Sequence, residues 1–185
     1  MPLRLRSAGG GSVQLNSPVA LATDVSMEVP GYAGAQLLTN KTPGVVLQVV
    51  NATASTEVST SAVDTWVSSG LSASITPRST SSRIIIIASQ NIGMDGTVGA
   101  GDAQFNLGIF RDSTLVFGKI GWDDNRANDV VDFVYRSGVS YVDSPATTSS
   151  VTYTTRGSCR SSGLGILKMQ YGGNFSSIIL MEIAG

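Results

Sequence analysis

The chain has 185 residues, of which 42% are hydrophobic and 14% are charged, and its formal net charge is −1. This composition is too apolar for a disordered chain and too neutral to bind nucleic acid or anionic lipid through a concentrated basic patch. The longest apolar runs have four or five residues, far fewer than the ~20 needed to span a bilayer, so we expect neither a nucleic-acid nor a membrane partner.

Residues 1–45 alternate apolar and polar side chains between Gly and Pro residues, but they contain too few large apolar residues for a core. No apolar segment of the signal-peptide type follows the basic start MPLRLRS. We interpret this region as an extended β-arm that must pack on another surface, and we place its boundary with a second domain, residues 46–185, near residues 39–44. The arm residues expected to make the attachment are Leu3, Leu5, Val13, Leu15, Val25, Met27 and Val29.

From residue 46 onward, turn residues separate short alternating segments, which is typical of an all-β chain. Leu71, Ala73 and Ile75 share one face of such a segment, and Pro77 ends it because proline has no N–H to donate. Residues 103–109 and 151–154 alternate in the same way. No amphipathic helix of convincing length is predicted; residues 59–69 could form one helical turn or a short strand.

Two segments invite a binding-site interpretation that their context does not favour. The glycine run at residues 93–102 would bind a dinucleotide only between a strand and a helix, and the alternating segment after it instead predicts a long loop between antiparallel strands. The second segment contains four carboxylates that could hold calcium or include a glycosidase pair. Their spacing is not that of an EF-hand, and Arg126 lies among them, so a solvated loop is expected; the carboxylates are Asp123, Asp124, Asp129 and Asp132.

The chain contains no histidine, so neither a Ser-His-Asp triad nor a histidine-bearing zinc site can be built from it. Its one cysteine, Cys159, is expected to be a small buried side chain rather than a reactive thiol. We therefore expect a non-enzymatic protein with no catalytic, cofactor-binding or metal site.

Two strand-like segments carry apolar side chains on both faces. Residues 84–87 are four consecutive isoleucines, and residues 178–183 contain a single charged residue, Glu182. If one face packs on an opposing sheet, the other exposes several large side chains, each worth roughly 1.5–3 kcal/mol when buried, and exposed apolar strands aggregate. We therefore expect an oligomer packed through these strands; the alternative is cover by the chain's own N-terminal arm. Residues 172–174, Gly-Gly-Asn, also predict a hairpin between residues 165–171 and the last strand.

The second domain contains, in this order, the segments SITPRSTSSRIIIIAS, LGIFRDSTLVFG, YVDSPATTSSVTYT and SSIILMEIAG. In order and spacing they resemble a C-terminal domain common in bacteriophage fibre proteins, and the first 31 residues are similar to the opening repeat of such fibres. The resemblance implies a virion protein, assembled in the host cytoplasm, that is a homotrimer with an antiparallel jelly-roll β-sandwich head like those of tumour necrosis factor and C1q. Residues 31–50 leave almost no room for a fibre shaft, so a capsid cement or decoration protein is the alternative.

In such trimers one sheet faces the three-fold axis, which assigns one face of each doubly apolar strand to the interface. We expect Ile179, Met181 and Ile183 to face the subunit's own core, and Glu182 to meet either solvent or an arginine, for which Arg83 is the first candidate. The arm would attach to capsid or tail proteins, and the head could bind a host-surface glycan or protein. A glycan-binding lectin or a glycan-active enzyme is a more remote alternative. The expected interface residues are Ile84, Ile86, Ile178, Leu180 and Glu182.

Overall fold

The computed structural model describes residues 4–6, 12–14, 43–97, 103–124, 130–160 and 165–185, with side chains described in 43–94, 104–118, 134–160 and 165–185. The chain divides into two compact units, Met1–Leu37 and Leu38–Gly185. In the first unit, β1 (Arg4–Arg6) pairs antiparallel with β2 (Ser12–Gln14), and Leu5 lies opposite Val13.

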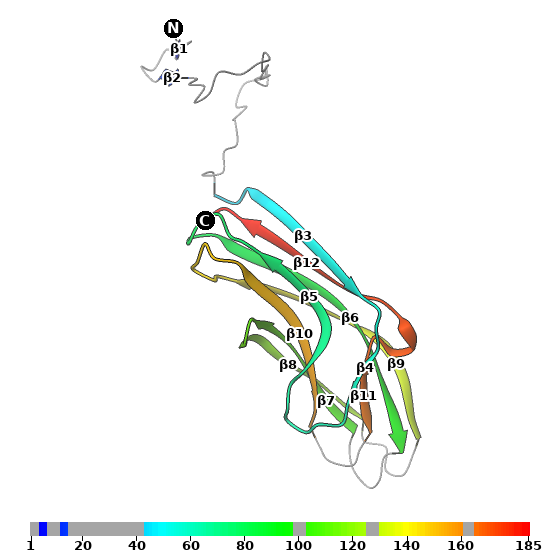
Figure 1. Ribbon diagram of the computed structural model, residues 1–185. Coiled ribbons are helices and arrows are strands. Elements are labelled where there is room, and N and C mark those ends of the chain that lie inside the picture. The colour runs from blue at the N-terminus through cyan, green and yellow to red at the C-terminus, as the bar shows by residue number, and fades with distance from the viewer. Residues whose placement is uncertain (1–3, 7–11, 15–42, 98–102, 125–129, 161–164) are drawn as a thin grey trace. The chain divides into compact units, whose positions relative to one another are not determined.

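The second unit is built from two antiparallel sheets (Figure 1). The larger sheet has four main strands in the order β3-β12-β6-β9, and short strands β4 and β11 extend it beside the far half of β6. The smaller sheet has the order β5-β10-β7-β8. The strands are β3 (Val46–Ala54), β4 (Val58–Thr60), β5 (Val67–Ile75), β6 (Arg83–Thr97), β7 (Ala103–Arg111), β8 (Thr114–Asp124), β9 (Val130–Asp143), β10 (Val151–Cys159), β11 (Ile166–Met169) and β12 (Ser176–Ile183).

Counting only the eight main strands along the chain, the first, eighth, third and sixth form one sheet and the second, seventh, fourth and fifth form the other. This is the strand order of a jelly roll, in which two Greek keys fold into facing sheets. The predicted all-β jelly-roll sandwich is confirmed. The described residues contain no α-helix, only a 3-10 turn, η1 (Tyr171–Gly173).

The interior contains two apolar clusters, one towards each end of the sandwich. The first includes Leu71, Ala73 and Ile75 of β5, whose alternation was visible in the sequence, packed against isoleucines of β6 and β12. The second surrounds Phe105 of β7 and Met169 of β11. Cys159 lies in the second cluster and is buried, as predicted.

A buried polar layer separates these clusters. Thr155 of β10 donates a 2.7 Å hydrogen bond to Oε1 of Gln90 on β6, and the hydroxyl of Ser69 on β5 bonds to that of Thr155. On the other side, Nε2 of Gln90 donates to the hydroxyl of Ser176 at 3.0 Å. Because both sheets contribute to this chain of hydrogen bonds, the unit is tied together at mid-length by hydrogen bonds as well as by apolar packing.

Three local expectations from the sequence are corrected or completed. The predicted hairpin between residues 165–171 and the last strand is wrong. β11 and β12 do not pair with each other but lie end to end along β6, joined by η1. The glycine-rich loop is shorter than expected, since residues 93–97 belong to β6, while residues 98–102 lie outside the described part of the chain. Residues 59–69 contain the end of β4 and the start of β5.

The junction between β11 and β12 depends on a glycine of the neighbouring strand. The ring of Tyr171 packs on the backbone of Gly93, where an added Cβ atom would lie 2.6 Å from ring atom Cδ1. Such a distance is too short for any real Cβ contact, so only glycine allows the ring this position. The absence of a side chain at Gly93 therefore makes room for the Tyr171 ring at the junction.

Candidate assembly surface

The structure places the predicted interface residues inside the chain's own core. Ile84, Ile86, Ile178 and Leu180 are fully buried between the two sheets. The assignment of these faces to a neighbouring subunit is therefore wrong, as is the expectation that Ile179 and Met181 face the core. The later residues of β6 determine which face is buried: the even-numbered face continues with Gln90, Ile92 and Met94 into the interior, whereas the odd-numbered face continues with Ser89, Asn91 and Gly93.

Glu182 faces inward as well, at one end of the first apolar cluster. Its carboxylate is fully buried and accepts three hydrogen bonds of 2.6 Å, from Nε2 of Gln48, the backbone N–H of Arg78 and the hydroxyl of Ser82. Burial by itself raises the pKa of Glu182, but the three hydrogen bonds outweigh burial and hold the pKa below its usual value. The expected partner Arg83 is exposed and belongs to the opposite face of the sheet, so that pairing is wrong.

The opposite face of the larger sheet presents three successive rows of side chains across β3, β12, β6 and β9. We call these twelve positions the uncharged face, because none of them is Asp, Glu, Lys or Arg. The first row is Val49, Met181, Ile85 and Val142; the second is Asn51, Ile179, Ile87 and Ser140; the third is Thr53, Ser177, Ser89 and Gly138.

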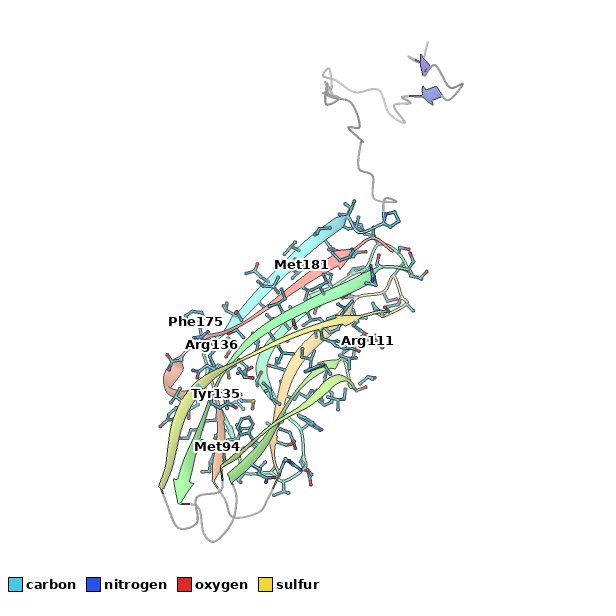
Figure 2. All side chains as sticks on the ribbon, turned by 180° about the vertical axis from the view of Figure 1, so that it is seen from behind. Met94, Arg111, Tyr135, Arg136, Phe175 and Met181 are labelled. Atoms are coloured by element: carbon cyan, nitrogen blue, oxygen red, sulfur yellow. The ribbon has the colours of Figure 1, made fainter. Side chains whose placement is uncertain are left out.

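Large apolar side chains of the uncharged face are exposed to solvent. The exposed fraction is 58% for Val49, 50% for Val142, 41% for Ile87 and 36% for Ile179. They come from all four strands, so the apolar patch crosses the whole width of the sheet. Figure 2 views this sheet, with Met181 marking the apolar end. The expectation that strands 84–87 and 178–183 carry a second apolar face is confirmed; the face lies on the odd-numbered residues.

Arginines border the uncharged face along the strands. Arg83 precedes the first row on β6, and Arg136 lies beyond the third row on β9. The guanidinium of Arg136 stacks over the ring of Phe175, 5.1 Å from its centroid, and Figure 2 shows the two side by side. The two arginines thus mark the ends of the uncharged face, and beyond Arg136 the same face of the sheet exposes two further apolar side chains, Val134 and Ile166.

The remaining buried titratable groups are bound in structural contacts. Asp143 of β9 accepts hydrogen bonds from Arg111 of β7 at 2.6 Å and from the Tyr153 hydroxyl of β10 at 2.7 Å. Burial, followed by the hydrogen bond to Asp143, raises the pKa of Tyr153 well above its usual value. Burial also raises the pKa of the Cys159 thiol, which disfavours the reactive thiolate.

Several predicted residues lie partly or wholly outside the described structure. Asp123 and Asp124 are on β8 and Asp132 is on β9, so the loop prediction is wrong for these three; their side chains and all of Asp129 are outside the described part. Among residues whose side chains are described, no three potential ligands gather. Of the arm residues, Leu5 and Val13 form a cross-strand pair, and the others lie outside: Leu3, Leu15, Val25, Met27 and Val29.

No family model and no curated protein matches the sequence. Among solved structures, the chain is similar to dimeric latent PorU from Porphyromonas gingivalis, with 7% identity, a TM-score of 0.40, and coverage of 79% of this chain and 14% of that chain. It is also similar to T=1 particles derived from infectious bursal virus, with 12% identity, a TM-score of 0.38, and coverage of 97% and 44%. The similarity to the structure of infectious bursal disease virus strain Gx has 14% identity and a TM-score of 0.39, and it covers 95% of this chain and 43% of that chain. The chain thus spans less than half of each structure, and likenesses at these TM-scores carry no argument about function. No helix in the described residues is long and apolar enough to cross a membrane.

Proposed function

We propose that the chain is a non-enzymatic structural protein of a bacteriophage virion. In this proposal, residues 46–185 form the jelly-roll head of a homotrimer on the particle surface, and residues 1–45 attach it to a capsid or tail protein. The observation that carries the proposal is the uncharged face, because a jelly roll with exposed valines and isoleucines across four strands is suited to contact with protein rather than with water. The sequence segments that resemble phage fibre heads support the choice of particle.

The buried polar groups agree with a structural role. Glu182 and Asp143 are the carboxylates buried among the described side chains, and each is held by hydrogen bonds that stabilise the sandwich. A catalytic carboxylate would instead be directed into a cleft open to substrate. A fold by itself does not assign a function. The proposal therefore rests on the uncharged face, and its test is whether purified virions contain the chain.

The copy number of the chain in purified virions tests the proposal. Quantitative mass spectrometry should detect the chain, in a number divisible by three. A few trimers per particle would identify a fibre-type protein, and a number approaching that of the major capsid protein would identify a cement protein. Absence from the particle would overturn the virion role. Sedimentation of the purified protein at micromolar concentration tests the trimer separately, and a well-folded monomer would exclude it.

A further inference from the structure

We infer that the uncharged face of the larger sheet is covered by the same face of other copies of this chain, with Ile87 and Ile179 nearest the symmetry axis. This inference rests on the proposed function only because both require the chain to form an oligomer. It adds which surface is buried and that copies of this chain cover it. The two residues lie opposite each other on the two central strands, β6 and β12. Both are exposed in the isolated chain.

The first argument is charge. The chain as a whole has 14% charged residues, so twelve exposed or half-exposed positions would include about one or two on average. The uncharged face includes none. Charge depletion is typical of the core of an interface, and a symmetry axis adds a further reason: each charged group there would approach its own copies and be repelled. A different protein would be free to offer complementary charges, so an uncharged face fits copies of this chain better.

The second argument is extent. With strands ~4.8 Å apart and alternate residues ~6.8 Å apart along each strand, twelve positions cover roughly 400 Å² of sheet. A standard interface buries ~800 Å² on each partner. The uncharged face is therefore the right size for the central part of an interface whose rim is polar. Arg83 and Arg136 lie where such a rim would begin.

Two pairs of substitutions on the same face of the same sheet test the location. Val142 and Val134 are both on β9, eight residues apart, and are 50% and 48% exposed; Val142 is in the first row and Val134 lies beyond Arg136. Ile87 and Ile166 are 41% and 42% exposed, and only Ile87 belongs to the uncharged face. Val142→Glu and Ile87→Glu should lower the apparent association constant at least 100-fold by sedimentation, whereas Val134→Glu and Ile166→Glu should change it less than threefold. If all four variants associate like the natural chain, the inference is overturned.

Mixing oppositely charged variants tests the occupant. Ile87→Glu and Ile87→Lys should each sediment as folded monomers with unchanged far-ultraviolet circular dichroism, and an equimolar mixture should form mixed oligomers. This complementation requires residue 87 of one copy to lie near residue 87 of another. If both variants are folded monomers and their mixture stays monomeric, the face does not meet itself and the inference fails. If a variant does not fold, Ile179→Asp and Ile179→Lys provide the same test from the neighbouring strand.

The outcomes separate this inference from the virion role. If the protein associates through the uncharged face but is absent from virions, the proposed function is wrong and the inferred interface is right. If the protein is present in virions in multiples of three and its charged variants remain trimers, the proposed function is right and the inferred interface is wrong.

Discussion

The hydroxyl of Tyr153 donates a 2.7 Å hydrogen bond to Oδ2 of Asp143, and this contact joins β10 of the smaller sheet to β9 of the larger. Tyr153 is fully buried, so its hydroxyl has no access to water if this partner is lost. Hydrogen bonds to charged groups contribute ~1.5–3 kcal/mol. We expect Tyr153→Phe to lower the free energy of unfolding by about 2 kcal/mol, measured by urea denaturation.

A double-mutant cycle checks that this loss belongs to the named contact. Asp143→Asn weakens the acceptor for both Tyr153 and Arg111 and should cost more than Tyr153→Phe alone. The two losses should not add, because both variants remove the same hydrogen bond. Strict additivity would show that the tyrosine is destabilised for a reason other than its contact with Asp143.

Glu182 predicts a defined pH dependence of stability. Its pKa in the folded chain is below the usual value of 4.5, so the unfolded chain binds the proton first as the pH falls. The stabilisation is therefore complete above pH ~5 and is lost as the pH falls through the lower, folded pKa. Glu182→Gln should be less stable than the natural chain at pH 7, with a difference that narrows below pH 4.5; denaturation series from pH 7 to pH 2 measure it. A difference independent of pH would contradict the role of the charge.

Gly93→Ala tests the close packing of Tyr171 on β6. The added methyl group would lie 2.6 Å from the ring, so the ring or the strand must move, and overpacking of this kind costs ~1–3 kcal/mol. Gly138→Ala is the matched control when both variants are compared as dilute monomers, since it lies on β9 of the same sheet and an added Cβ meets no atom of the chain within 4 Å. Thermal unfolding of both variants should show a clear loss for Gly93→Ala alone. Equal effects would mean that strand propensity, rather than Tyr171, determines the loss.

Gln90→Leu tests the polar layer between the two apolar clusters. The leucine would fill the space but would remove the acceptor of the Thr155 hydroxyl and one donor to the Ser176 hydroxyl. These two hydroxyls would keep only Ser69 and the Asn91 N–H as partners. An unsatisfied buried polar group costs ~1–3 kcal/mol, so we expect a loss of about 3 kcal/mol in urea denaturation. The triple variant Gln90→Leu, Thr155→Val, Ser176→Ala should recover part of it. A Gln90→Leu variant as stable as the natural chain would show that the layer contributes nothing.

The sequence predicts much of the fold because alternation is a local property. Leu71, Ala73 and Ile75 are buried as their spacing indicates, and Pro77 lies just after the end of β5. The sequence prediction assigned the wrong face of β6 to the core because residues 84–87 are all isoleucine. Alternation within these four residues gives both faces the same side chains and cannot distinguish them. The decisive signal lies further along the strand, where Ile92 and Met94 continue one face.

Other features depend on contacts between distant residues and have no local signal. Gln170 has a φ of 56° and a fully buried side chain, a combination that its neighbours in the sequence do not indicate. The partners of Glu182 come from β3, from the turn after β5 and from the residue before β6. Their convergence results from the jelly-roll order of the strands, and it becomes visible only when that order is known.

The end-to-end arrangement of β11 and β12 has a mechanical consequence. On one flank of β6 the neighbouring strand is interrupted at η1, whereas on the other flank β9 pairs with β6 without interruption from Ile84 and Asp143 to Thr97 and Val130. A tensile load along the head would therefore be carried in shear by the β6–β9 ladder, the longest in the described chain. The strands on the interrupted flank would separate from β6 first, and the separation would start beside Tyr171.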